Sequence, residues 1–172
     1  MTHLSTSVYL ALLLASPFIL AEALRFITPA LYENERKYSA RITITIFALF
    51  ATGILMSYFI IFPFSIRFLG TYQVSSEVVN MINLSSYIST FTTLTFLMEI
   101  VFQIPVISFF LAKMGILQAE FMAKYRRHAL ILILIIAAVI TPPDLFTQIL
   151  VTVPMYALYE VSILIVKRIT NN

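Results

Sequence analysis

The side chains best suited to chemistry form a polar stripe within a long apolar run. At 3.6 residues per turn, their spacing of three or four residues predicts one face of a helix. A carboxylic acid at membrane depth is costly to bury, which makes Glu99 a functional candidate, with Gln103 as its polar neighbour. The structural alternative is a protonated Glu99 that hydrogen-bonds to a neighbouring helix. The stripe consists of Ser85, Ser89, Thr92, Phe96, Glu99 and Gln103.

A second polar segment, residues 26–37, separates two apolar runs and has the sequence F-I-T-P-A-L-Y-E-N-E-R-K. Pro29 should end the preceding helix, because it lacks an N–H and its ring clashes with the turn before it. A carboxylate at a membrane surface would suit a cationic peptide, since arginine forms two parallel hydrogen bonds to it. Alternatively, the charges are a solvated helix start, stabilised by the helix dipole and by pairing among themselves. The charged residues are Glu33, Glu35, Arg36 and Lys37.

The third polar feature is the turn T-P-P-D at residues 141–144, which follows a short apolar run. Two consecutive prolines cannot continue a helix, and Thr141 or Asp144 suits the start of the next one. As a helix, the preceding run would be about 18 Å long, against about 30 Å for a hydrocarbon core. Either the bilayer thins here or another helix fills in, and Thr141 and Gln148 are placed to hydrogen-bond to such a helix. Alternatively, both side chains bond within the hairpin.

The sequence contains none of the motifs typical of phosphate binding, metal binding or hydrolysis. The glycines are isolated, so there is no glycine-rich phosphate loop, and the chain has no cysteine and no H-E-x-x-H motif. A Ser/His/Asp hydrolase is not supported either. We therefore expect no enzyme activity, no catalytic residues, no metal site and no cofactor. The small net charge of +3 forms no nucleic-acid-binding patch.

The composition predicts an integral membrane protein. Apolar residues make up 60% of the 172 residues and charged residues only 11%, against roughly 25% charged in a soluble domain. A soluble protein of this size could not bury so much apolar surface, so lipid must act as the solvent. We predict one all-α membrane domain, residues 1–172. Its spans are predicted at residues 8–24, 42–62, 85–112, 129–140 and 145–166.

Proline and glycine mark the limits of these runs. The second run ends at Pro63, and Pro105 is expected to kink the third. Gly115 should end the third run, because glycine readily adopts the left-handed conformation. Residues 63–84 are too polar to span and are predicted to form an external loop.

The basic residues predict the orientation. With five alternating spans, all of the eleven Lys and Arg residues except Arg67 fall on one side of the membrane. The positive-inside rule makes that side cytoplasmic, which places the N-terminus outside and the C-terminus in the cytoplasm. The predicted cytoplasmic loops are residues 25–41 and 113–128, and the predicted external loops are residues 63–84 and 141–144.

Five motifs occur in order along essentially the whole chain. They are F-I-T-P-A-L-Y-E-N-E-R-K-Y, F-P-F-S-I-R-F-L near Pro63, F-Q-I-P-V, I-T-P-P-D-L-F-T-Q and V-P-M-Y-A-L-Y-E. In order and spacing they resemble the TatC family, the multi-spanning receptor subunits of the twin-arginine translocase. The resemblance implies a concave six-span bundle with two short C-terminal helices. The five runs resemble spans two to six, so we expect the first span, and the segments around it, to be missing from this chain.

The resemblance also implies roles for particular residues. Phe26 and Glu35 match positions that contribute to the cytoplasmic twin-arginine site. The intramembrane glutamate of the family aligns with Gln103, and Glu99 lies one turn earlier, about 6 Å along the helix axis. Our hypothesis is that Glu99 takes over that polar role on the same face.

The remaining matched residues surround the hairpin turn. Thr141 and Gln148 match positions implied in docking single-span partners of the TatA or TatB type. Asp144 matches the external acid of the T-P-P-D motif. The partners implied are therefore twin-arginine signal peptides, TatA- or TatB-type subunits, further copies of the chain and the lipid bilayer.

Together these features predict a receptor and scaffold for the export of folded proteins, driven by the proton motive force across the bacterial cytoplasmic (inner) membrane. The alternative is a small-solute or proton-coupled transporter that uses Glu99 as a relay. A third alternative is that a chain lacking one span is a non-functional fragment. Solute flux would indicate a transporter, whereas crosslinks to a twin-arginine peptide would indicate the receptor.

Overall fold

The computed structural model describes residues 2–27, 35–71, 84–141 and 145–170, and these ranges are helical apart from short connections. No strand occurs within them, which confirms the all-α prediction. The helices are α1 (Thr2–Ile27), α2 (Glu35–Met56), α3 (Phe62–Thr71), α4 (Leu84–Phe102), α5 (Ile104–Lys113), α6 (Ala119–Lys124), α7 (Arg126–Ile140) and α8 (Leu145–Thr170).

Within the described residues, four helical stretches are long and apolar enough to cross a membrane: Ser7–Phe26, Ala40–Arg67, Ser86–Lys113 and Leu145–Thr170. Helix α7 has 15 residues, which gives it a length of about 22 Å. The five predicted spans therefore correspond to four long helical stretches and one short helix.

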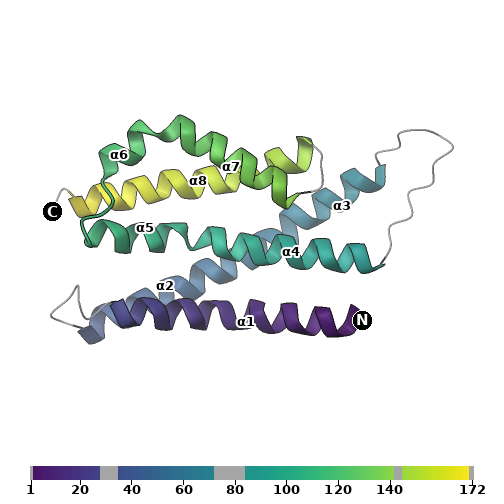
Figure 1. Ribbon diagram of the computed structural model, residues 1–172, viewed down its shortest axis with the longest axis horizontal. Helices are drawn as coiled ribbons and strands as arrows, with labels where there is room; N and C mark the ends of the chain where they lie inside the picture. The colour runs from purple at the N-terminus through teal and green to yellow at the C-terminus, as the bar shows by residue number, and fades with distance from the viewer. Residues whose placement is uncertain (1, 28–34, 72–83, 142–144, 171–172) are drawn as a thin grey trace.

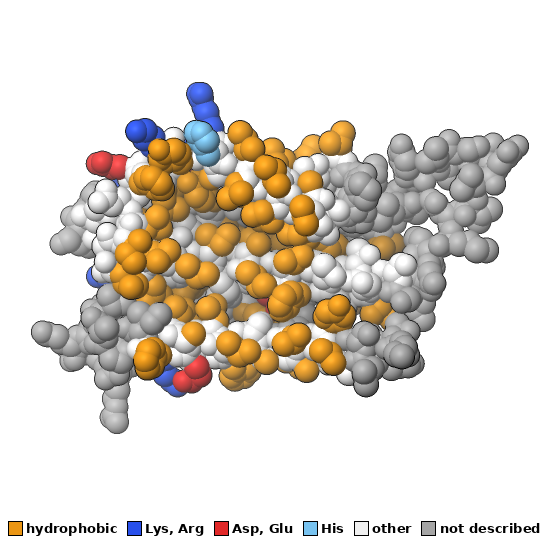
Figure 2. Space-filling model, in the orientation of Figure 1, with side chains coloured by type: hydrophobic (Ala, Val, Ile, Leu, Met, Phe, Trp, Pro, Cys, Tyr) orange, Lys and Arg blue, Asp and Glu red, His pale blue; other side chains and the backbone are white. Residues whose placement is uncertain are grey.

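The helices run roughly along the long axis of the molecule, with α2 and α3 crossing behind α4 (Figure 1). The C-terminal ends of α1, α5 and α8 lie at one end, together with the start of α2. The N-terminus, α3 and the start of α8 lie at the other end. Charged side chains visible on this face gather at the first end, beside a broad apolar surface (Figure 2). Arg67, on α3, belongs to the opposite end.

The prediction that the second helix ends at Pro63 is wrong, because the chain stays helical as far as Thr71. A π-helical turn, Ser57–Ile61, connects α2 to α3, and the N–H of Phe62 bonds to the carbonyl oxygen of Ser57. Widening the helix in this way shifts the hydrogen-bond register just before the proline. Pro63 then lies in the first turn of α3, where its missing N–H costs little. Residues 63–71 are consequently helix rather than loop.

The kink predicted at Pro105 coincides with a break between two helices. Gln103 separates α4 from α5, and its carbonyl oxygen accepts bonds from the N–H groups of both Val106 and Ile107, each 3.0 Å long. Pro105 lies in the first turn of α5, a position where proline is tolerated. Gly115 follows the end of α5 with φ of 74°, the left-handed conformation that was predicted.

Helices α2 and α4 approach closely at Gly53. A Cβ atom at this position would lie 3.2 Å from the carbonyl oxygen of Met98 and 3.3 Å from the Cα atom of Glu99. Small residues permit such close packing between membrane helices. Next to this contact, the hydroxyl groups of Ser57 and Thr95 share a buried hydrogen bond of 3.0 Å. The glycine therefore fixes the distance between α2 and the part of α4 that carries Glu99.

The largest buried cluster joins the π-helical turn, α3, α4, α7 and α8. Because these segments are far apart in the sequence, this cluster holds the C-terminal hairpin against the centre of the bundle. Its members are Ile61, Phe62, Leu94, Met98, Val101, Phe102, Ile133, Ala137, Val151 and Met155.

Polar contacts fix the start of α7 on α8. Arg126 forms an ion pair with Glu160, with Nε 2.9 Å from Oε1, and a terminal nitrogen donates a hydrogen bond of 2.9 Å to Oε2. The hydroxyl of Tyr156 also donates to Glu160, at 3.0 Å. The hydroxyl of Tyr159 donates to the carbonyl oxygen of Met122 in α6, at 2.9 Å. The segment predicted as a cytoplasmic loop, residues 113–128, is thus largely helical and anchored to α8.

We predict that Gly53→Leu destabilises the protein by about 1–3 kcal/mol, because the larger side chain must push α2 away from α4. Thermal unfolding in detergent micelles measures this change. Ala51→Leu, at an exposed position on the same helix, is the control and should leave the midpoint unchanged. Equal midpoints for the two variants would contradict the close packing of α2 on α4.

Candidate functional site

A hollow of about 310 Å³ opens between α1, α2 and the junction of α4 with α5. Glu99 and Gln103 both line it, one helical turn apart. Apart from these two residues and Ser16, the lining is apolar. The structure therefore brings together the two polar residues that the sequence singled out within the membrane.

Glu99 is almost fully buried, with 1% of its surface exposed. The hydroxyl of Ser16, on α1, donates a hydrogen bond of 3.2 Å to its Oε2 atom. Its other oxygen, Oε1, is buried and has no hydrogen-bond partner among the described residues. Glu99 thus contacts a neighbouring helix, as the structural alternative required, but this contact satisfies only half of its carboxyl group.

Gln103 is 5% exposed and occupies the break between α4 and α5. Its Nε2 atom donates a hydrogen bond of 3.3 Å to the carbonyl oxygen of Ile46, on α2. Its Oε1 atom is buried and lacks a partner. Among the described side chains, the oxygens of Glu99 and Gln103 are the buried polar atoms left unpaired.

Two unpaired oxygens beside an apolar hollow define what this site can bind. A buried acceptor without a partner costs about 1–3 kcal/mol, and a ligand that donates a hydrogen bond recovers that cost. The apolar lining favours a ligand whose remaining surface is hydrophobic. The arrangement suits an apolar helix or peptide that carries a hydrogen-bond donor.

The rest of the predicted stripe does not face the hollow as one surface. Thr92 is buried, and its hydroxyl bonds to the carbonyl oxygen of Ile88 in the same helix, at 2.8 Å. Ser89 is exposed, and the side chain of Ser85 lies outside the described residues. Phe96 lines the hollow beside Glu99. The polar side chains of the stripe that line the hollow, Glu99 and Gln103, therefore both lie at its C-terminal end.

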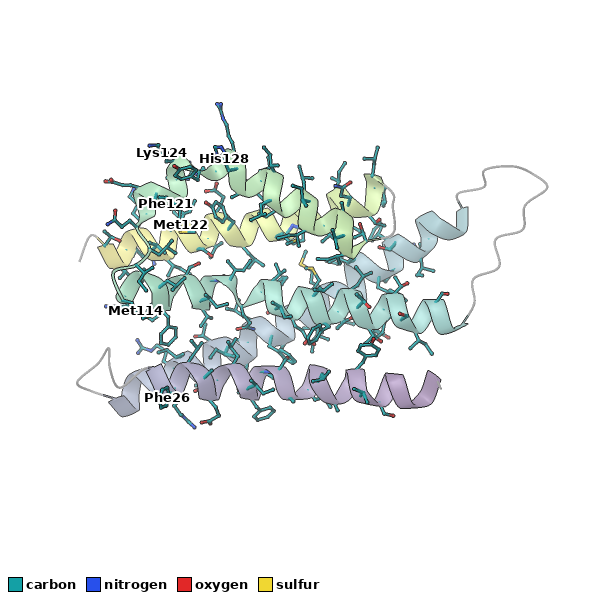
Figure 3. All side chains as sticks on the ribbon, viewed as in Figure 1. Phe26, Met114, Phe121, Met122, Lys124 and His128 are labelled. Atoms are coloured by element: carbon teal, nitrogen blue, oxygen red, sulfur yellow. The ribbon has the colours of Figure 1, made fainter. Side chains whose placement is uncertain are left out.

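Phe26 and Glu35 belong to the ends of two consecutive helices. Phe26, near the end of α1, is 88% exposed and lies at the same end of the bundle as Met114, Phe121 and Lys124 (Figure 3). Glu35 is the first residue of α2. The structure describes its backbone but not its side chain, and residues 28–34 lie outside the described ranges.

Thr141 and Gln148 both bond within the C-terminal hairpin. The Thr141 hydroxyl donates to the carbonyl oxygen of Ala137, at 2.9 Å. The Nε2 atom of Gln148, on α8, donates to the carbonyl oxygen of Leu134, on α7, at 3.0 Å. These bonds agree with the alternative in which both side chains bond within the hairpin rather than to an added helix. Asp144 lies outside the described residues.

Ser16 is the site residue that sequence reasoning missed. It belongs to the wall of the hollow and holds the carboxyl group of Glu99 from α1. It immediately precedes Pro17, inside an apolar helix. A hydroxyl next to a helix-interior proline was the available signal, but the sequence alone does not show which helix faces Glu99.

Comparisons with known proteins identify the family. The family model described as Sec-independent protein translocase protein (TatC) matches residues 1–154. TatC of Blattabacterium sp. subsp. Periplaneta americana (strain BPLAN) is 42% identical over 153 residues, which cover 89% of this chain and 58% of that protein. TatCy of Bacillus subtilis (strain 168) is 40% identical over 158 residues, covering 92% of this chain and 62% of that protein.

The fold agrees with this assignment. A crystal structure of the twin-arginine translocase receptor TatC superposes with a TM-score of 0.82 and 32% sequence identity, over 95% of this chain and 72% of that chain. The present chain spans about three fifths of the length of the two curated relatives above. From the family match, the identities and the shared fold, the chain is a membrane protein that belongs to the TatC family of Sec-independent protein translocase proteins.

Proposed function

We propose that this chain acts as a receptor and scaffold in a twin-arginine translocase of the bacterial cytoplasmic membrane. The observation that carries the proposal is the hollow lined by Glu99 and Gln103. The Oε1 atom of each residue is buried there and can accept a hydrogen bond from a ligand. Its relatives are named as components of a protein translocase rather than as enzymes. A guest polypeptide therefore suits the site better than a reacting substrate.

The first step of the proposed mechanism takes place at the end of the bundle that carries most of the basic residues, which we assign to the cytoplasm. Glu35, at the start of α2, receives the arginine pair of a signal peptide, and the exposed ring of Phe26 packs beside it. Glu22, on α1, is already paired with Arg25 at 2.9 Å. This pairing leaves Glu35 as the better candidate for binding the peptide.

The second step takes place at membrane depth. The apolar part of the signal peptide, or a partner helix, enters the hollow between α1 and α4 and donates a hydrogen bond to Glu99 or Gln103. Binding of the guest helix is favoured because unpaired buried oxygens cost free energy, and the hydrogen bond removes that cost. Transport itself draws on the proton motive force, so the chain needs no catalytic residue or cofactor.

A partner helix has a separate candidate surface on the short helix α7. Its outward side chains Ile131, Leu132, Ile135 and Val139 are exposed, with Val139 at 82%. We propose that a single-span subunit of the TatA or TatB type packs along this surface. Thr141 and Gln148, which shape the end of the hairpin, would set the depth at which it docks.

A twin-arginine peptide carrying a photo-crosslinker should label residues 26–35, and a twin-lysine peptide should not, since lysine cannot form the bidentate contact. Glu35→Gln should reduce labelling about tenfold, the effect of losing one charge-assisted hydrogen bond. Glu22→Gln, at an acid that is already paired, is the matched control and should keep wild-type labelling. Equal labelling by both peptides would rule out this site.

Glu99→Ala should reduce export of a twin-arginine substrate about tenfold in a complementation assay, because the donor on the guest helix loses its partner. Gln103→Ala should also reduce export, because Gln103 lines the same hollow. Thr93→Ala, at an exposed position of α4, is the control. Wild-type export by Glu99→Ala would refute the proposed role, and solute flux through the purified protein would support a transporter instead.

The absence of cysteine allows partner docking to be mapped with single cysteines. We expect Val139→Cys to form a disulfide with a single-span partner that carries a cysteine at matching depth. Ile44→Cys, exposed on α2, should not. Adding Gln148→Ala to Val139→Cys should shift the crosslink along the partner helix. Equal crosslinking at both positions would argue against a specific surface on α7.

A further inference from the structure

A second pocket lies against a different face of the α4–α5 helix pair from the hollow that contains Glu99. It is formed by α2, α5 and α8 and has a volume of about 300 Å³. On α5 it is lined by Val106 and Phe109, whereas the first hollow is lined by Gln103 and Ile107. At about 100° per residue, the mean directions of these two pairs differ by about 110°, so they point to different faces of the helix.

The walls of this pocket are almost entirely apolar. Leu49 of α2 and Leu158 and Val161 of α8 line it together with the α5 residues. Its polar side chains are Arg41 and Thr45, both on α2. The Thr45 hydroxyl already donates to the backbone carbonyl oxygen of Arg41, at 2.9 Å. The guanidinium of Arg41 is therefore the polar group that remains to recognise a ligand.

Arg41 lies at the edge of the membrane, because the second candidate span begins at Ala40. Its side chain is exposed, and among the described residues no carboxylate forms an ion pair with it. It shares this end of the bundle with the last turn of α8, which carries Lys167 and Arg168 (Figure 1). The pocket thus has a positive charge at the interface and an apolar interior at membrane depth.

We propose that this pocket binds an anionic phospholipid, with an acyl chain between α2, α5 and α8 and the phosphate group on Arg41. Arginine forms bidentate hydrogen bonds to phosphate, and basic pockets between membrane helices suit anionic headgroups.

This inference does not depend on the proposed receptor function. It uses neither Glu99 nor the exposed surface of α7, and it requires only that the helices cross a membrane. A bound lipid would fill the gap between α2 and α8, two helices that otherwise contact each other little at this end.

Native mass spectrometry of the purified protein tests the proposal. Phosphatidylglycerol and phosphatidylcholine with identical acyl chains are titrated separately. We expect tighter binding of phosphatidylglycerol. Arg41→Gln should weaken its binding about fivefold, the effect of one arginine near an anionic surface. Phosphatidylcholine binding should weaken less, because its choline group offsets the charge of the phosphate. Arg168→Gln, which removes an exposed charge outside the pocket, is the matched control.

A second pair of variants tests the position of the acyl chain. Val161→Phe fills the pocket and should weaken binding of both lipids. Leu164→Phe makes a similar change on the same helix, at an exposed position that does not line the pocket, and should have no effect. Equal losses from Arg41→Gln and Arg168→Gln would overturn the headgroup assignment. Unchanged binding by Val161→Phe would overturn the placement of the acyl chain.

Discussion

Lipid offers no hydrogen bonds, so each polar group that enters the membrane must find a partner on the protein itself. Most of the polar groups buried in this bundle do so, and several of their bonds connect different helices. Ser57 bonds to Thr95, and Gln148 reaches the backbone of α7. Glu99 and Gln103 are each only half satisfied. That deficit, maintained by the close packing at Gly53, distinguishes the hollow from the rest of the interior.

The broken helix pair α4–α5 separates two environments. One face looks toward α1 and carries the polar groups of the hollow. The other face is directed toward α2 and α8, and it is largely apolar up to Arg41 at the edge of the membrane. Because Pro105 interrupts the helix between them, the two halves need not share one straight axis. A polypeptide ligand and a lipid can therefore be accommodated on different faces without competing.

Local patterns predicted most of the helices and the two polar residues that line the hollow. The spacing of Glu99 and Gln103 placed them on one face, and Pro105 and Gly115 marked the interruption and the end of that helix. The hydrogen bond from Ser16 was not predictable, because it depends on which helices pack together. The continuation of the helix through Pro63 was missed for a similar reason, since the π-helical turn lies where Ser57 meets Thr95. The functional roles of the predicted site residues all remain predictions: Phe26, Glu35, Glu99, Gln103, Thr141, Asp144 and Gln148.

The π-helical turn also sets the rotational phase of α3. A π-helical turn contains one residue more than an α-helical turn, so it offsets everything after it by about 100° around the axis. Phe62, directly after it, packs edge-to-face against Phe91 with ring centroids 4.8 Å apart. Deleting one residue from this turn would restore a regular helix and, at the same time, swing Phe62 away from α4. The irregular turn thus acts as a spacer that aligns the two halves of one long helix with different neighbours.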